Sequence, residues 1–491
     1  MLYCQSWQSR AQSLCTLVFV LAGTCVMLAS CFQGNRELSE AERSAFSTYV
    51  DSLDSSITGK WFTRMGISED ADSMLAYLRR ELPRNGLDTA AFQLAEIAED
   101  LSIVHALAFD SVGISINELL PRLDERLTHA YVRYTVGQRY GFVSPEKLFN
   151  RLDSNVRRDG FARLFDYEIK ARNVHEAEQK VMDEDRLDYL LASQPTGQLY
   201  QILQVQLDNT SDKAARRRLA VNMERCRWKI SHPEDEDRKI VVNIPSLQLW
   251  AVCADSVVNM KICCGALATK TPLLHSQINY LQVNPDWIIP QNIVDTDITR
   301  HAGDSAYFAR NNYYIVRRST GDTLQTASVT ADQLRTGALR VGQKGGPGNS
   351  LGRIVFRFPN NFGVYLHDTN NRGAFNRERR TLSHGCIRVQ KPFELACFLL
   401  PEADEWKLDR IRISMDIAPE TDQGKEYLEE HVEDPRPYRL LGYSDVSPKT
   451  PVYIIYYTAY PNPESGQVET WPDLYGYDKV IDKAMGDLLP K

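Results

Sequence analysis

The spacing of apolar residues changes at Trp228, and this change constrains the fold more than any other feature of the chain. Before it, three stretches place apolar residues three or four positions apart, as on one face of a helix: 71–80, 90–101 and 124–134. After it, segments such as 239–253 are rich in β-branched and aromatic residues with stretches of period-two alternation, as in strands. The sequence therefore predicts an α+β protein, with a helical N-terminal scaffold domain at 31–225 and a mostly β domain at 226–491.

The predicted β domain is interrupted and extended by further segments. Prolines and glycines punctuate its strands, and we place an insertion, a cap subdomain, at about 295–343. The tail 450–491 is expected to supply one more strand of the same sheet, at 450–460, and then a short helix near 479–489. Ahead of the domain, 211–227 is rich in Arg, Ala and Leu, which predicts one long helix whose arginines face solvent.

The N-terminus indicates export. Leu14–Ser30 is a 17-residue apolar stretch, short for a membrane-spanning helix and typical of a secretory signal, and a polar segment follows it. Its end, Leu28-Ala29-Ser30-Cys31, resembles the bacterial lipobox, which implies a signal peptide at 1–30 and a lipid on Cys31. An uncleaved signal anchor is the alternative. Either way the protein is expected in the periplasm, held at a bacterial membrane.

Composition argues against several classes of partner. The net charge is −7, with 57 basic and 64 acidic residues and no long basic run, so nucleic acid is not expected to bind. The ten cysteines form no C-x-x-C pair, and neither a zinc ribbon nor a redox motif is indicated. The glycine-rich run 342–348 lacks the ending of a phosphate-binding loop, and we interpret it as a mobile flap beside a cleft.

A cysteine and a histidine are the candidate catalytic residues. His367 stands nineteen residues before Cys386, and Cys386 follows Gly385 in a short polar turn. A nearby imidazole activates a thiol, and a glycine before the nucleophile lets backbone N–H groups face the carbonyl under attack. In an extended segment, Tyr365 and His367 share one face, which would open into a cleft, while Val364 and Leu366 pack inward. These residues suggest acyl transfer through a thioester.

This pattern, His367 followed by Ser383-His-Gly-Cys-Ile-Arg-Val389, resembles the signature of the YkuD-type L,D-transpeptidases. Further blocks resemble the large YcbB-like subfamily: Asn222–Trp228, Val242–Pro245, Asn284–Trp287, Gly348–Gly352, Phe358–Asn360 and Tyr365–Asp368. The helical half and the tail are similar to it as well. One departure is that only about 200–223 fills the place where larger members carry a peptidoglycan-binding module.

The resemblance implies a role for each matching residue. Cys386 is the expected nucleophile and His367 its base, oriented by a backbone carbonyl such as that of Asp368. The N–H groups of His384, Gly385 and Cys386 are expected to form the oxyanion hole. The resemblance also implies substrate contacts, among them carboxylate-binding arginines, since a guanidinium suits a carboxylate: Ser383, Arg388, Tyr365, Asp368 and Arg380. A structural ion pair is the alternative for the arginines.

The implied reaction joins two peptidoglycan stem peptides without metal or cofactor. Donor and acceptor are diaminopimelate-containing stems, the donor a tetrapeptide that loses D-alanine, and the product is a 3→3 cross-link. Water or a protein amine as acceptor would instead give a carboxypeptidase, a cross-link hydrolase or a protein-anchoring enzyme. A rival of another class is a wall-binding lipoprotein without catalysis. The sequence leaves open the acceptor and the oligomeric state.

Overall fold

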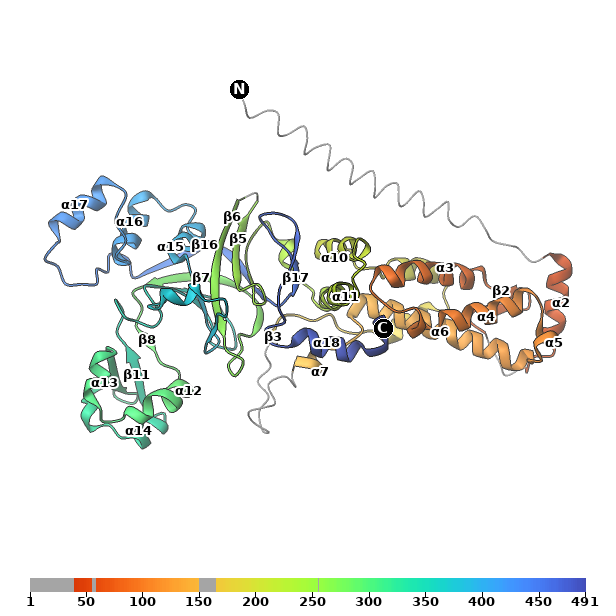
Figure 1. The fold of residues 1–491 in the computed structure, drawn as a ribbon, viewed down its shortest axis with the longest axis horizontal. Coiled ribbons are helices and arrows are strands. Elements are labelled where there is room, and N and C mark those ends of the chain that lie inside the picture. Colours follow the sequence, from red (N-terminus) through yellow and green to blue (C-terminus); the bar gives the residue numbers. More distant parts are fainter. Residues whose placement is uncertain (1–38, 55–58, 150–164, 255) are drawn as a thin grey trace, which may run out of the picture. The chain divides into compact units, whose positions relative to one another are not determined.

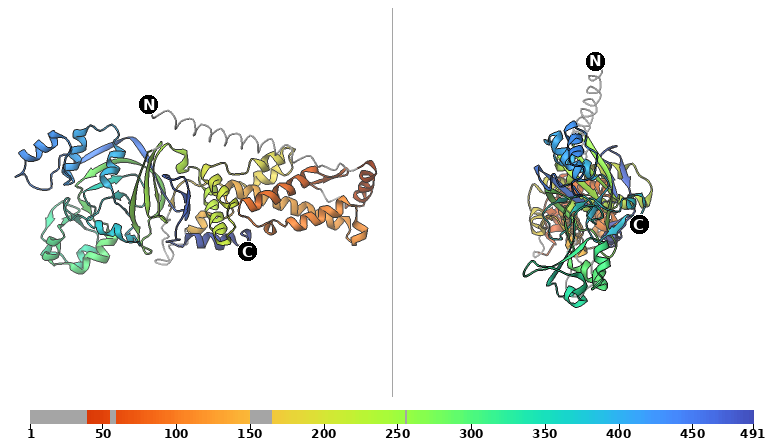
Figure 2. Two further views of the ribbon diagram at one scale, coloured as in Figure 1. Left: turned by 45° about the horizontal axis from the view of Figure 1, so that its top comes forward. Right: turned by 90° about the vertical axis from the view of Figure 1, so that its left-hand side faces the viewer.

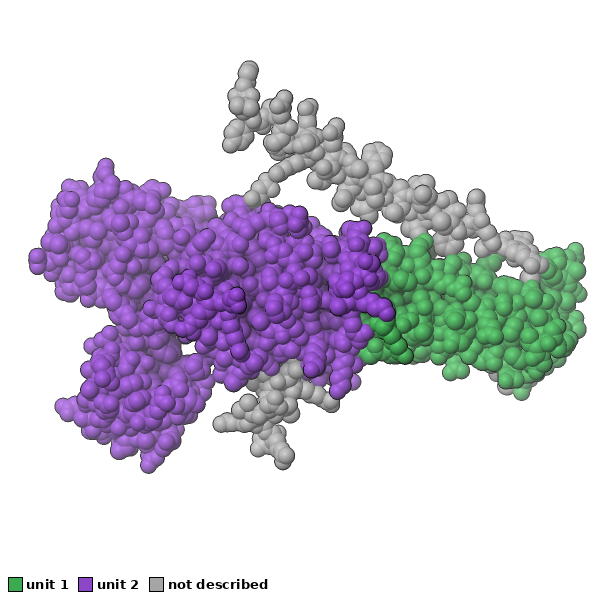
Figure 3. All heavy atoms as spheres, viewed as in Figure 1, with its two compact units in different colours: residues 1–142, 171–195, 485–491 green, residues 143–170, 196–484 purple. Residues whose placement is uncertain are grey.

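The computed structural model describes residues 39–54, 59–149, 165–254 and 256–491. The predicted signal peptide and Cys31 lie outside these residues. The chain divides into two compact units, coloured separately in Figure 3. Unit 1 consists of residues up to 142, 171–195 and 485–491, and unit 2 of residues 143–170 and 196–484.

Unit 1 is helical, which confirms the prediction from apolar spacing (Figure 1). Helix α6 buries Leu119, Leu123 and Leu127 completely at a spacing of four residues, as an amphipathic helix does. Ser39 and Ser68 cap the first turns of α2 and α3 with their hydroxyl groups. The elements are α2 Glu40–Asp51, β1 Phe62–Thr63, β2 Gly66–Ile67, α3 Glu69–Arg84, α4 Leu94–His105, α5 Phe109–Val112, α6 Ile116–Tyr140, α8 Val174–Lys180 and α9 Arg186–Leu191.

The centre of unit 2 is a ten-stranded sheet in the order β12-β13-β15-β6-β5-β4-β16-β7-β3, with β14 paired to β6 (Figures 1 and 2). Because β12 also pairs with β7, the run from β12 to β7 closes on itself and leaves few unpaired strand edges. The strands are β3 Phe165–Asp166, β4 Arg238–Asn243, β5 Gln248–Cys253, β6 Ser256–Gly265, β7 Leu273–Val283, β12 Ile354–Arg357, β13 Leu366–His367, β14 Thr381–Ser383, β15 Ile387–Val389 and β16 Tyr443–Ile455.

Two helices cover one face of this sheet. They are α10 Gln198–Asp208 and α11 Lys213–Trp228, and α11 confirms the predicted long helix. Leu203 and Met223 pack with Trp250 of β5 in one apolar cluster. The arginines of α11 differ from the predicted solvated face: Arg217 is ion-paired with Asp482 rather than free in solvent. The helix is thus held to the rest of unit 2 by apolar packing and by charge.

The insertion forms a subdomain with its own sheet and core, which we call the cap and define as residues 287–343. Its strands follow the order β10-β9-β11-β8, and Ile289, Phe308 and Ile315 are buried in its apolar cluster. Its elements are β8 Trp287–Ile288, α12 Gln291–Ile293, the π-helical turn η3 Val294–Ile298, η4 Thr299–His301, α13 Ser305–Arg310, β9 Tyr313–Arg317, β10 Thr323–Leu324, α14 Ala331–Arg335 and β11 Leu339–Gln343.

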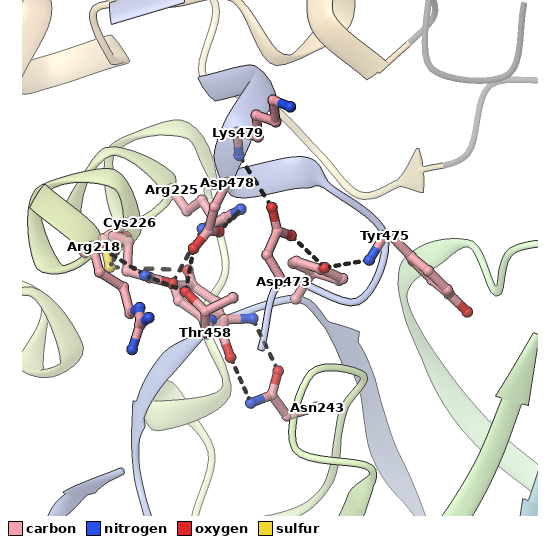
Figure 4. A network of polar contacts seen from close by, with 12 residues as sticks. Arg218, Arg225, Cys226, Asn243, Thr458, Asp473, Tyr475, Asp478 and Lys479 are labelled. Atoms are coloured by element: carbon pink, nitrogen blue, oxygen red, sulfur yellow. Dashed lines mark hydrogen bonds and ion pairs between the residues drawn. The ribbon is translucent and has the colours of Figure 1, made fainter. Parts of the chain in front are cut away.

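The C-terminal tail returns to α11 (Figure 4). The predicted tail strand is confirmed as the end of β16, which pairs with β4 and β7, and the predicted helix is α18 Tyr477–Met485. Asn222 of α11 donates from its side-chain amide to Oγ1 of Thr458 at 2.9 Å, and Arg225 donates to Asp478 at 2.6 Å. The tail also carries two short strands, β17 Ala459–Pro461 and β18 Val468–Thr470. Between β15 and β16 lie the helices α15 Pro392–Leu399, α16 Glu405–Ser414 and α17 Asp422–Glu430.

Within the described residues, no helix is long and apolar enough to cross a membrane. The six described cysteines are free thiols, and Cys226, Cys263 and Cys264 are buried. No group of three or more candidate metal ligands occurs in the described part of the chain.

Candidate active site

His367 and Cys386 line one cavity of about 350 Å³, between the cap and the ten-stranded sheet. His367 ends β13, and Cys386 immediately precedes β15, so the parallel pairing of these two strands brings the two residues to the same region. The sheet side also contributes Tyr365, Ser383, His384 and Arg388, and the cap contributes Trp287, Asn292, Asp297, Tyr307 and Tyr313.

The turn before Cys386 is fixed by hydroxyl groups. Ser383 Oγ donates to the carbonyl oxygen of Cys386 at 2.5 Å and accepts the N–H of Gly385 at 3.1 Å. Thr271 Oγ1 donates to the carbonyl oxygen of Gly385 at 2.8 Å. The backbone polar groups of the turn are therefore held by buried side chains, which fixes the position of Cys386.

Gly385 has a φ of +115°, a conformation that residues with a side chain rarely adopt. A Cβ at this position would meet its nearest atom, in Val364, at 3.7 Å, so space is available and the backbone alone requires glycine. The sequence placed Gly385 in the oxyanion hole, and the structure corrects this: its N–H is already donated to Ser383. The N–H groups of His384 and Cys386 remain as candidates for that role.

The imidazole of His367 is neutral in this environment. Burial, and next the positive charge of Arg388, lower the pKa of His367 to about 3. Backbone groups of Asp368 and Leu351 act in the opposite direction. The side chain faces the cavity as predicted, although the residue is only 5% exposed. A neutral imidazole can accept a proton, which is what a base beside a thiol must do.

The thiol of Cys386 is also neutral at rest. Burial raises the pKa of Cys386, while the backbone and hydroxyl of Tyr365 and the charges of Arg357 and Arg388 oppose that shift. An imidazole can activate a thiol by lowering its pKa or by taking its proton, and the two pKa shifts here favour the second way. The proton then moves when the substrate carbonyl is attacked.

Tyr365 connects Cys386 to the cap. Its hydroxyl interacts with the Cys386 thiol and with Trp287 of β8, and burial raises the pKa of this phenol. The ring lies edge-on to His367, with centroids 5.7 Å apart, and the guanidinium of Arg357 covers it at 4.3 Å. Tyr365 is therefore a rigid part of the site.

The two predicted substrate-binding arginines have different environments. Arg388 lines the cavity, its Nε is buried without a hydrogen-bond partner, and no described carboxylate forms an ion pair with it. Arg380 is buried outside the cavity and donates to the carbonyl oxygens of Ile262, Arg377 and Leu247. The predicted substrate contact of Arg380 is thus corrected to a structural role, because all of these donors serve the backbone.

Asp368 also lies outside the lining of the Cys386 cavity. Its carboxylate accepts hydrogen bonds from Arg372 and from the N–H of Arg353, each at 2.9 Å. It lines a separate cavity of about 480 Å³, so a direct substrate contact at the thiol is not supported. The glycine-rich run borders that second cavity through Gly346 and Gly348, and not the Cys386 cavity as the predicted flap would.

Comparison with known proteins matches the chain to two families. Residues 237–454, which include His367, Cys386 and the cap, match the family model described as the YkuD L,D-transpeptidase catalytic domain. The match identifies a YkuD-type catalytic domain in this part of the chain. Residues 58–207 match the family described as the Scaffold domain. A YkuD domain with a Scaffold domain is typical of YcbB-like proteins, which confirms the predicted relationship.

A curated relative agrees with this family. The Haemophilus influenzae (strain ATCC 51907 / DSM 11121 / KW20 / Rd) protein named "Putative L,D-transpeptidase" is 29% identical over 305 residues. The match covers 61% of this chain and 56% of the relative, so the chain spans about half the length of that protein.

The sequence did not single out the cap residues of the YkuD site. Trp287 stood in a family-like block without an assigned role, and Asp297 was not considered. Both line the cavity because the cap, a separate subdomain, packs there. Their distance from Cys386 along the chain does not predict this position.

Proposed function

We propose that the protein is a peptidoglycan L,D-transpeptidase that forms 3→3 cross-links through a thioester on Cys386. One observation supports this most: Cys386, His367 and Arg388, which forms no ion pair with a described carboxylate, line a single cavity within a YkuD domain. The whole-protein activity is our inference from this site.

The first step is attack of the Cys386 sulfur on the diaminopimelate carbonyl carbon of a donor tetrapeptide. His367 accepts the thiol proton as the C–S bond forms. The C–N bond to the terminal D-alanine then breaks, and His367 returns the proton to the departing amine. The N–H groups of His384 and Cys386 stabilise the oxyanion.

In the second step, the side-chain amine of another stem attacks the thioester carbon. The C–S bond breaks, an amide bond forms, and the amine proton passes through His367 to the sulfur of Cys386. Attack by water would give a shortened tripeptide instead.

The environment of Arg388 supports a peptide with free carboxylates as the donor. The buried Nε of Arg388 has no hydrogen-bond partner, which carries a desolvation cost, and a bound carboxylate offsets that cost with charge-assisted hydrogen bonds. Diaminopimelate stems carry several carboxylates.

Incubation with purified disaccharide tetrapeptides tests the function. Cross-linked dimers with release of D-alanine are the expected products. Tripeptides alone would indicate a hydrolase. Unchanged substrate, with identical results for the wild type and Cys386→Ala, would support the wall-binding lipoprotein and contradict the proposal.

The location is a separate proposal. We infer export and a lipid on Cys31 from the apolar stretch before it and the lipobox-like residues. The variant Cys31→Ala should leave the membrane fraction or retain its signal peptide, as shown by fractionation and mass. Unchanged fractionation and mass would favour a signal anchor.

A further inference from the structure

The cap brings a carboxylate to the mouth of the Cys386 cavity. Asp297 Oδ2 lies 3.8 Å from Nε2 of His384, the residue two positions before the nucleophile. The two side chains are 45% and 48% exposed, so both remain accessible to a ligand that enters the cavity. The pair thus lines the same cavity as Cys386 and remains accessible there.

The cavity lining has few charged side chains, and they are of opposite sign. Among the described lining residues, Asp297 is the one carboxylate and Arg388 the one guanidinium. Arg388 suits the carboxylates of a stem peptide, and Asp297 suits an ammonium group. The acceptor amine of a diaminopimelate stem is such a group, since it is protonated in neutral water.

The backbone around Asp297 is unusual. Val294–Ile298 forms a π-helical turn, a rare conformation that occurs often at functional sites. Ile298 and Asp297 of this turn line the cavity, whereas Asp295 is exposed outside it and accepts a hydrogen bond from Gln291. The turn therefore presents one of its two acidic residues to the site.

We propose that Asp297, assisted by His384, forms the subsite for the acceptor amine. This inference rests on the proposed function and assigns its second substrate. Asp297 binds the amine as ammonium, and the imidazole of His384 accepts one proton and releases it to solvent. The neutral amine then attacks the thioester carbon, the C–S bond breaks, and the remaining proton reaches the Cys386 sulfur through His367.

The first test compares Asp297→Asn with the matched control Asp295→Asn, which removes the same charge from the same turn outside the cavity. With disaccharide tetrapeptides, the ratio of dimers to released D-alanine should fall roughly tenfold in Asp297→Asn, as expected for loss of a charge-assisted contact. Asp295→Asn should keep the wild-type ratio. An unchanged ratio in Asp297→Asn, or an equal fall in both variants, would overturn the assignment.

The second test measures binding without chemistry. In the Cys386→Ala background, titration calorimetry compares a diaminopimelate tripeptide with the same peptide acetylated at its side-chain amine. The free amine should bind about tenfold more tightly, and Asp297→Asn should abolish this preference. Equal binding of both peptides to Cys386→Ala would refute the subsite. A wild-type enzyme that makes no dimers would instead refute the proposed function, so the two failures are distinguishable.

Discussion

At the residue scale, burial keeps both Cys386, the proposed nucleophile, and His367, its proposed base, neutral. Burial raises the pKa of Cys386 and lowers the pKa of His367, so both shifts oppose a resting thiolate–imidazolium pair. Reactivity toward small electrophiles and turnover of a bound substrate are therefore separate properties of this site. Only the second has an oxyanion to stabilise.

Alkylation of Cys386 tests this ionisation state. Because the pKa of Cys386 is raised, its thiolate fraction should still be increasing above about pH 8.5, the ordinary thiol value. The rate of modification by iodoacetamide, followed by mass on the Cys386 peptide, should show no plateau below that pH. His367→Ala should leave the profile unchanged, since His367 is neutral throughout. A plateau near pH 6 that disappears in His367→Ala would show a resting ion pair.

Gly385 offers a second residue-scale prediction. The variant Gly385→Ala forces a side chain into φ +115° and should cost about 1–3 kcal/mol of stability, with loss of acylation. Gly373→Ala, at an exposed glycine without a positive φ, is the control and should be nearly neutral. Urea denaturation and D-alanine release measure both effects. Equal behaviour of the two variants would contradict the conformational requirement.

At the element scale, the sequence predicted those helices and strands that depend on local residue patterns. The amphipathic pattern located α3, α4 and α6, and strand composition located β4, β5 and the end of β16. The site depends on pairings between distant segments, such as Leu366 with Ile387 across two parallel strands. No spacing rule predicts that Asp297 lies beside His384, or that Arg380 donates its hydrogen bonds to backbone carbonyls, because both contacts follow from tertiary packing.

The turn between β14 and β15 gives a prediction at this scale. Ser383→Ala removes the hydroxyl that joins the carbonyl oxygen of Cys386 to the N–H of Gly385. We expect D-alanine release to fall about 10- to 100-fold, as for a catalytic turn displaced by a fraction of an ångström. Ser276→Ala, which removes one hydroxyl contact to Pro359 elsewhere, should retain activity. Full activity of Ser383→Ala would show that the turn keeps its conformation without this hydroxyl.

At the scale of the whole molecule, the tail joins the catalytic sheet to α11. The ion pair of Arg225 and Asp478 has side chains only 4% and 16% exposed, whereas that of Arg217 and Asp482 is about one third exposed. A buried pair that loses one partner leaves an uncompensated charge in the interior. The tail is therefore expected to contribute stability to unit 2 without taking part in the chemistry.

Two variants measure that contribution. Arg225→Met should lower the free energy of unfolding by about 3–5 kcal/mol, because Asp478, whose side chain is only 16% exposed, loses its ion-pair partner. Arg217→Met should cost about 1 kcal/mol or less, since solvent screens its pair. Urea denaturation of the full chain compares them. A similar loss in both would mean that burial does not decide the strength of these pairs.

The acyl-enzyme is the most direct test of the central claim. After brief incubation with a diaminopimelate tetrapeptide, intact mass should show the protein plus the peptide minus D-alanine, and peptide mapping should place the adduct on Cys386. The Cys386→Ala variant should show no adduct and release no D-alanine. An adduct on another cysteine, or D-alanine release that persists in Cys386→Ala, would contradict the account.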